Sequence, residues 1–191
     1  MDIDEKLQQV RSLFGQKHYE EGLNLLLSLP QEEPEVQLLF ADYYDLFLQH
    51  PSAFRLYEQA AQKGNPQAMY MVAKYIFYKL DGADNDIKKA QKLLLQAAQS
   101  GNLQAMANLA DYYARGEYQF PKNEELSLQW LTKAAEQGNA NGMCELGRCY
   151  LFGHGVEIDY AKALYWLNAA KTAGDAHAAK WIKYAERQAK K

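Results

Sequence analysis

A hexapeptide that ends in Gly-Asn or Gly-Asp recurs through this chain at a nearly fixed period. The copies are Ala-Ala-Gln-Lys-Gly-Asn at 60–65, Ala-Ala-Gln-Ser-Gly-Asn at 97–102, Ala-Ala-Glu-Gln-Gly-Asn at 134–139 and Ala-Lys-Thr-Ala-Gly-Asp at 170–175. Successive copies lie 37, 37 and 36 residues apart, counted from glycine to glycine. Self-similarity of this length is typical of stacked repeats that contact only their neighbours. The period therefore predicts a solenoid, whose usual product is an extended binding surface.

The residues that follow each glycine repeat with the geometry of one helix face. Small residues stand four positions on, large apolar residues eight positions on and, in three units, small residues nine positions on. These sets are Ala68, Ala105, Gly142 and Ala178; Val72, Leu109, Leu146 and Ile182; and Ala73, Ala110 and Gly147, with Lys183 departing in the last unit. Such spacing follows one face of an α-helix, which we call helix A of each unit.

A second apolar stripe precedes each glycine and predicts a helix B. Small residues stand eleven and four positions before the glycine, and Leu or Trp stands eight before it. The three sets are Ala53, Ala90, Ser127 and Ala163; Ala60, Ala97, Ala134 and Ala170; and Leu56, Leu93, Trp130 and Trp166. The alanines allow close approach of helix backbones while the larger side chains fill the remaining space. We therefore expect small residues to pack opposite large ones throughout the array.

The junction between helix B and the next helix A is also specified. Glycine suits the left-handed residue just after a helix, and Asn or Asp caps the start of the next helix. At 64–66 a proline follows at the first helical position. So short a connection makes the two helices packed, roughly antiparallel neighbours.

The same logic divides the whole chain into units. Ala-Asp-Tyr-Tyr at 41–44 repeats letter for letter at 110–113, so 34–48 is predicted as a helix A and 52–63 as its helix B. We expect one solenoid domain over 1–191, all-α and right-handed. Its predicted parts are a leading hairpin at 4–29, units at 34–64, 66–101, 103–138 and 140–174, and a capping helix at 176–190.

Residues 142–167 carry a family resemblance. They closely resemble a Sel-1-like repeat in three landmarks: Leu-Gly followed by Tyr, then Gly-His-Gly-Val followed by Asp, then Lys-Ala followed by Trp. The units at 66–101 and 103–138 are looser copies, because 81–86 and 116–121 replace the Gly-x-Gly-Val turn; we expect these loops to differ in shape. Residues 18–23 with Pro34 resemble the related tetratricopeptide pattern. The resemblance implies an αα-solenoid adaptor that binds other proteins.

Charge and composition restrict the possible partners and the compartment. Residues 1–50 hold ten acids and three bases, residues 171–191 hold six bases and two acids, and elsewhere the two signs are interleaved. This is not the dense basic stripe of a nucleic-acid binder. No apolar run approaches the ~20 residues that span a bilayer, and 1–6 lack the pattern of a secretory signal. We expect a cytoplasmic, bacterial protein without membrane insertion; the oligomeric state stays open, with a monomer as the expectation.

Candidate chemistry is limited to a few side chains, namely His18, His50, His154, His177, Cys144 and Cys149. No two of them have a spacing that metal sites favour. The two cysteines lie about 140° apart around one predicted helix, which excludes a mutual disulfide. The turn at 153–155 lacks the third glycine and the Gly-Lys-Ser/Thr of phosphate loops, and no Gly-x-Ser-x-Gly elbow occurs. We therefore predict no catalytic residue, no metal and no cofactor.

The tetratricopeptide resemblance implies that the A helices line a concave surface. The positions that face it stand three, six, ten, thirteen or fourteen after each glycine. They include Gln67, Tyr70, Lys74, Phe77, Tyr78, Gln104, Asp111, Arg115, Asn141, Arg148 and Phe152, and the first unit, aligned with the later ones, contributes Glu35, Asp42 and Asp45. Aromatic rings and arginines among both charge signs are typical of protein-binding surfaces. The alternative for the aromatic members is packing between helices.

These observations favour a non-enzymatic adaptor or scaffold that holds a segment of a partner protein in its concave groove. A dedicated neutralising protein for a toxin or effector is the second hypothesis, which would hold one partner at nanomolar strength. A hydrolase is the third, because some extracellular members of the family are described as β-lactamase-like. Those members resemble disulfide-stapled, cysteine-rich chains, whereas this chain has two cysteines.

Overall fold

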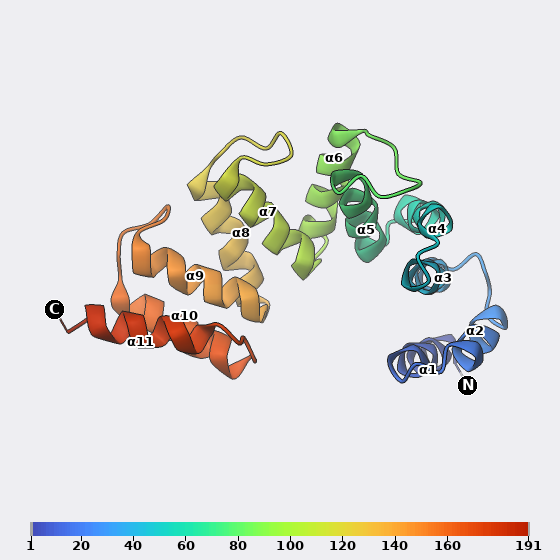
Figure 1. Ribbon diagram of the computed structural model, residues 1–191, viewed down its shortest axis with the longest axis horizontal. Helices are drawn as coiled ribbons and strands as arrows, with labels where there is room; N and C mark the ends of the chain where they lie inside the picture. Colours follow the sequence, from blue (N-terminus) through green and yellow to red (C-terminus); the bar gives the residue numbers. More distant parts are fainter. Residues whose placement is uncertain (1, 191) are drawn as a thin grey trace. The chain divides into compact units, whose positions relative to one another are not determined.

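The computed structural model describes residues 2–190, which form eleven α-helices and no strand. Consecutive helices pack against each other in pairs (Figure 1), which confirms the all-α array of hairpins. The helices are α1 (Ile3–Gly15), α2 (Tyr19–Leu27), α3 (Pro34–Leu46), α4 (His50–Gln62), α5 (Pro66–Phe77), α6 (Ile87–Gln99), α7 (Leu103–Arg115), α8 (Glu124–Glu136), α9 (Ala140–Phe152), α10 (Tyr160–Thr172) and α11 (Ala178–Gln188). None of the helices in this range is both long and apolar enough to cross a membrane.

The chain divides into two compact units, residues 1–100 and 101–191. Unit 1 contains α1 to α6 and unit 2 contains α7 to α11. The division falls between Ser100 and Gly101, inside one copy of the repeated hexapeptide. The boundary between units is therefore also a boundary between repeats.

Glycine and asparagine build the junctions from helix B to helix A as predicted. At Gly64, Gly101, Gly138 and Gly174 the backbone φ angles are +89°, +91°, +87° and +93°, a region that favours glycine. The next residue in the first three junctions is an asparagine that caps the following helix. The Asn139 side chain, for example, accepts a hydrogen bond of 2.7 Å from the Gly142 amide.

Two predicted helix starts shift by about two residues for local reasons, and two helices end two residues early, α3 at Leu46 and α11 at Gln188. α11 begins at Ala178 instead of residue 176, because the Asp175 carboxylate accepts hydrogen bonds of 2.8 Å from the amides of His177 and Ala178. α4 begins at His50 instead of residue 52, with Pro51 in its first turn. The turn before α4 places Leu48 at φ +58°, and its side chain is 76% exposed.

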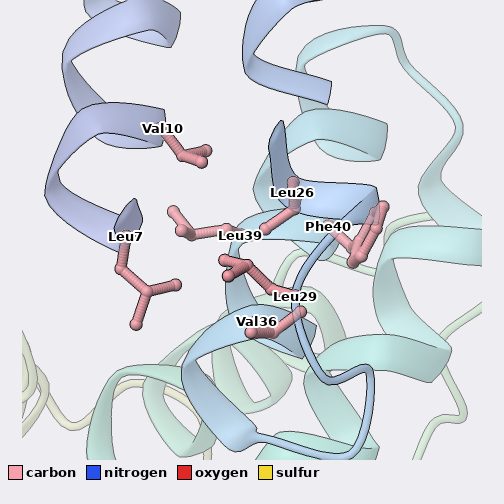
Figure 2. Packing of buried hydrophobic residues seen from close by; sticks show 7 residues of the cluster. All are labelled: Leu7, Val10, Leu26, Leu29, Val36, Leu39 and Phe40. Atoms are coloured by element: carbon pink, nitrogen blue, oxygen red, sulfur yellow. The ribbon is translucent and has the colours of Figure 1, made fainter. Parts of the chain in front are cut away.

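Within unit 1, the leading hairpin is attached to α3 through one apolar cluster. Figure 2 shows side chains from α1, α2 and α3 directed toward one another. The buried members are Leu7, Val10, Leu26, Leu29, Val36, Leu39 and Phe40. Burial of apolar side chains of this size contributes about 1.5–3 kcal/mol each, so the cluster fixes α1 and α2 onto the first repeat.

Small residues pack opposite large ones in unit 2. A Cβ atom added at Gly147 of α9 would lie 2.7 Å from Cγ of Leu167 on α10 and 3.1 Å from the carbonyl oxygen of Ala163. Both Leu167 and Ala163 are fully buried. The two helices are therefore as close as a glycine allows.

Of the two loops that the sequence predicts to differ from the turn after α9, the one after α5 differs where it begins and the one after α7 does not. The loops after α7 and α9 both begin with a left-handed glycine, Gly116 and Gly153. The loop after α5 instead has Lys79 at φ +52°, and its Gly82 lies against Pro51. In unit 2, Gly155 packs against the backbone of Glu124 at the start of α8, so the loop after α9 contacts the preceding hairpin.

Candidate functional site

Unit 2 contains a hollow of about 620 Å³ bordered by α7, α8 and α9. Four of the predicted partner-facing residues line it, namely Asp111, Arg115, Asn141 and Arg148. Gln104 and Phe152, the other two predicted residues of this unit, are outside the lining. The spacing rule for the A helices therefore includes four of the ten lining residues that α7 and α9 supply.

The rest of the lining was missed by that rule. Helix B and the two loops contribute Lys122, Glu124, Ser127, Leu131 and His154, and the A helices add Ala107, Asn108, Ala110, Ala114, Glu145 and Cys149. Counting positions after the glycine considers only the helix A face, whereas α8 closes one side of the hollow. A sequence signal for the polar part is the serine at 127, where the other units have alanine.

Two ion pairs hold the charged side chains of the hollow in place. Arg115 Nε lies 2.9 Å from Asp111 Oδ1, one turn earlier on α7. Arg148 Nη1 donates to both carboxylate oxygens of Glu145, at 2.6 and 2.7 Å. Exposed pairs of this kind contribute little stability, but they fix the directions of donors and acceptors. The Arg148 Nε atom is buried without a hydrogen-bond partner.

An aromatic cluster continues from Arg148 toward α11. The Arg148 Cζ atom lies 4.7 Å from the ring centroid of Trp181. Phe152 contacts Trp181 edge-on, with centroids 5.7 Å apart, and contacts Tyr184 at 5.6 Å. His154 stacks on Phe152 at 5.9 Å. Phe152 is partly buried in this cluster, so it combines packing with a position beside the hollow.

In unit 1, carboxylates of α3 are held by buried tyrosines. The Tyr57 hydroxyl of α4 donates to Asp42 at 2.7 Å, and the Tyr75 hydroxyl of α5 donates to Asp45. Both tyrosines are fully buried. His50 Nδ1 lies 3.1 Å from the same Asp45 carboxylate. Loss of water around the carboxyl group raises the pKa of Asp42 above its ordinary value. The hydrogen bond from Tyr57 lowers this pKa, and the negative charge of Asp45 raises it further.

The remaining predicted residues of unit 1 differ in how exposed they are and in what they contact. The Glu35 carboxylate accepts a hydrogen bond of 2.5 Å from the Arg11 guanidinium and one of 2.7 Å from the Asn65 side-chain amide. Phe77 is only 5% exposed, so its ring packs in the core and is not a contact surface, whereas Tyr78 is 51% exposed. Gln67, Tyr70 and Lys74 are partly exposed on α5.

The thiols are poor nucleophiles where they stand. Burial raises the pKa of Cys149 to about 11 and that of Cys144 to about 12, so both are protonated at neutral pH. Both are free thiols. Within residues 2–190, no group of three or more His, Cys, Asp or Glu side chains is placed to hold a metal ion. The lining of the hollow therefore offers hydrogen bonds and charge but no activated thiolate.

Comparison with protein families finds one matching model, described as the Sel1 repeat. It matches residues 49–65, 66–102, 103–139 and 140–175, which is well over half of the chain. All four matches end at the Gly-Asn or Gly-Asp junctions that the hexapeptide marks, and the last three also begin there, whereas the first begins at residue 49. A comparison with curated proteins finds no match.

Solved structures with the same arrangement of helices come from several bacteria. A Sel1 repeat protein from Oxalobacter formigenes is 24% identical, with a TM-score of 0.82 over 94% of this chain and 74% of that chain. The protein c5321, a protective antigen present in uropathogenic Escherichia coli strains with an SLR fold, is 27% identical, with a TM-score of 0.77 over 89% of this chain and 37% of that chain. A putative Sel1 repeat protein from Klebsiella pneumoniae is 18% identical, with a TM-score of 0.59 over 95% of this chain and 91% of that chain.

Proposed function

Since this chain belongs to the Sel1 repeat family, we propose that it is a non-enzymatic interaction module that binds a segment of a partner protein in the hollow of unit 2. The observation that carries the proposal is the gathering of Asp111, Arg115, Asn141 and Arg148 around one concavity. These side chains come from two successive repeats, so the site is formed by stacking and not by any single repeat.

The chemistry of the lining suits a polypeptide. Asn141 presents an amide that both donates and accepts, and Ser127 presents a hydroxyl, which are the groups that pair with peptide N–H and C=O. The two arginine–carboxylate pairs add charges of both signs in fixed positions. A volume of about 620 Å³ lies within the range of ~300–1,000 Å³ that is usual for ligand sites.

The same lining argues against a reaction. A nucleophile needs a lowered pKa or an adjacent base. The one thiol in the lining, Cys149, instead has a raised pKa because it is buried. Arg115 and Arg148 are each paired with an acid on the same helix, and these pairs hold their guanidinium groups in position to bind a partner.

The repeat structure supplies a matched pair of variants for the test. Asn141 and Gln104 stand at the same position, three residues after the glycines of successive repeats, and both are exposed. Only Asn141 lines the hollow. Peptides selected from a random display library on the wild-type protein should bind Asn141→Trp at least about 10-fold more weakly, because the indole fills the site. Gln104→Trp should bind them as the wild type does. Equal loss, or no loss, in both variants contradicts the proposal.

A further inference from the structure

Resting on the proposed function, we infer that the partner segment is acidic and carries an aromatic side chain, and that it continues from the hollow across one face of α11. We call this the α11 face and define it by Lys180, Lys183, Tyr184 and Arg187. The sequence assigned α11 only a capping role.

The four side chains share one side of the helix. At 100° per residue, Lys180, Lys183, Tyr184 and Arg187 fall within an arc of about 100°. All four are exposed, and Tyr184 is 41% exposed. The buried residues Ala178 and Ala185 lie on the opposite side. The α11 face is therefore exposed to solvent, although the Tyr184 ring also contacts Phe152 and Lys180 lies over the Trp181 ring.

The positive charges of the α11 face are not neutralised. Within the described part of the chain, no ion pair involves Lys180, Lys183 or Arg187. The one acid of α11, Glu186, lies about 60° beyond Lys183, on the side away from Tyr184. Three unpaired bases on one short helix favour an acidic partner.

Aromatic contacts connect this face to the hollow. Tyr184 lies 5.6 Å from Phe152, and Trp181 lies 5.7 Å from Phe152, measured between ring centroids. Arg148, which lines the hollow, and Lys180, which belongs to the α11 face, both lie over the Trp181 ring, at 4.7 and 4.9 Å. A chain that leaves the hollow past Arg148 therefore meets the exposed edge of Tyr184, where an aromatic side chain can stack.

A polypeptide fits this combined surface better than a continuous polyanion. The lining of the hollow balances three acids against three bases, so it offers no net positive charge to a phosphate backbone laid through it. The acids are Asp111, Glu124 and Glu145, and the bases are Arg115, Lys122 and Arg148. A polypeptide can place neutral polar residues in the hollow and its acids on α11. The charge pattern therefore assigns a neutral polar part of the segment to the hollow and an acidic, aromatic part to the α11 face.

The test uses fluorescence anisotropy with a short fluorescein-labelled peptide that has a Ser/Asn-rich half followed by a half of Asp and Phe. Two matched peptides carry Lys for each Asp or Ala for each Phe. The acidic–aromatic peptide should bind most tightly, and K180E/K183E/R187E should weaken its binding about 10-fold or more, since three partly exposed charge pairs become repulsive. Raising the salt concentration should weaken binding to the wild type.

A control variant changes the net charge equally but elsewhere. R55E/K88E/K92E alters three exposed bases of unit 1 and should bind the peptide as the wild type does. The milder K180Q/K183Q/R187Q gives an intermediate affinity if charge is the cause. Circular dichroism confirms that each variant is folded.

The outcomes separate this inference from the proposed function. Loss of binding in Asn141→Trp with unchanged binding in K180E/K183E/R187E overturns the inference and leaves the hollow as the site. Loss in the α11 variant alone supports α11 docking and overturns the hollow. The inference is overturned if the Asp and Lys peptides bind equally well, or if neither peptide binds. Salt-sensitive self-association of the wild type that the α11 variant abolishes would make a second copy the occupant and overturn a separate partner.

Discussion

Replacing Gly147 by alanine tests the close contact between α9 and α10 in unit 2. The added Cβ would lie 2.7 Å from Cγ of Leu167, whereas carbon atoms in contact prefer about 3.5–4.0 Å. It would also lie 3.1 Å from the backbone oxygen of Ala163, which cannot rotate away. α9 and α10 must therefore separate by up to about 1 Å, or Leu167 must leave its rotamer.

Two opposing effects decide the sign of the change. Overpacking of a buried site costs about 1–3 kcal/mol, and the clash with a fixed backbone atom places this site in the upper part of that range. Exchange of glycine for alanine inside a helix returns about 1 kcal/mol. The net expectation for Gly147→Ala is a loss of about 1–2 kcal/mol in the free energy of unfolding.

The chain offers a selective assay, because its three tryptophans, Trp130, Trp166 and Trp181, all belong to unit 2. Urea unfolding followed by tryptophan fluorescence therefore reports on this unit. In a double-mutant cycle, Leu167→Ala alone should cost about 2–5 kcal/mol. The double variant should be less destabilised than the sum by about 1 kcal/mol or more, because the new methyl group fills part of the cavity. Unchanged or increased stability of Gly147→Ala would refute the close contact.

Four further predictions concern the junctions and unit 1. Gly138→Val should lose about 1–2 kcal/mol by the same fluorescence assay; nothing lies within 4 Å of its Cβ position, so the cost is that of φ +87° alone. Asn139→Ala should lose about 1 kcal/mol with the cap, and an unchanged midpoint would contradict its role. The raised pKa of Asp42 means that the folded state binds its proton more tightly than the unfolded chain, so wild-type stability gains a contribution as the pH falls from neutral. Asp42→Asn should be more stable than the wild type at pH 7, and its stability, followed by circular dichroism in thermal melts, should lack the gain at lower pH. Tyr57→Phe should lose about 1–3 kcal/mol in the free energy of unfolding, because the Asp42 carboxylate loses its hydrogen bond.

Local chemistry made the fold predictable from the sequence. The caps at Gly138 and Asn139 depend on residues within one turn, so the pattern predicts their conformations directly. Where a side chain competed, the boundary moved, as at Asp175, which delays the start of α11. Long-range partners were not predictable in this way, and Tyr57 is an example, because nothing in its own helix indicates that its hydroxyl meets Asp42.

The site was predicted only in part for the same physical reason. The helical spacing identified Asp111 and Arg148, since a face of a single helix is a local property. It also included Phe77, which is buried, because spacing gives direction around a helix but not what covers it. Glu124 was missed because it comes from helix B and is brought to the hollow by tertiary packing.

The hexapeptides at 60–65, 134–139 and 170–175 close one helix with their own backbone groups, and the asparagine or aspartate that ends each of the four copies caps the next helix. The capping hydrogen bonds are therefore local, although the Asn65 side chain also donates to Glu35 of α3. A cassette of 37 residues cut from one asparagine to the next carries a complete start and a complete end. Duplication or deletion of such a cassette leaves every remaining cap intact and changes only which side chains meet across the new seam. The length of the array can therefore change by whole cassettes without disturbing how any helix starts or ends. What limits such a change is whether the buried side chains of the newly adjoining cassettes fit together.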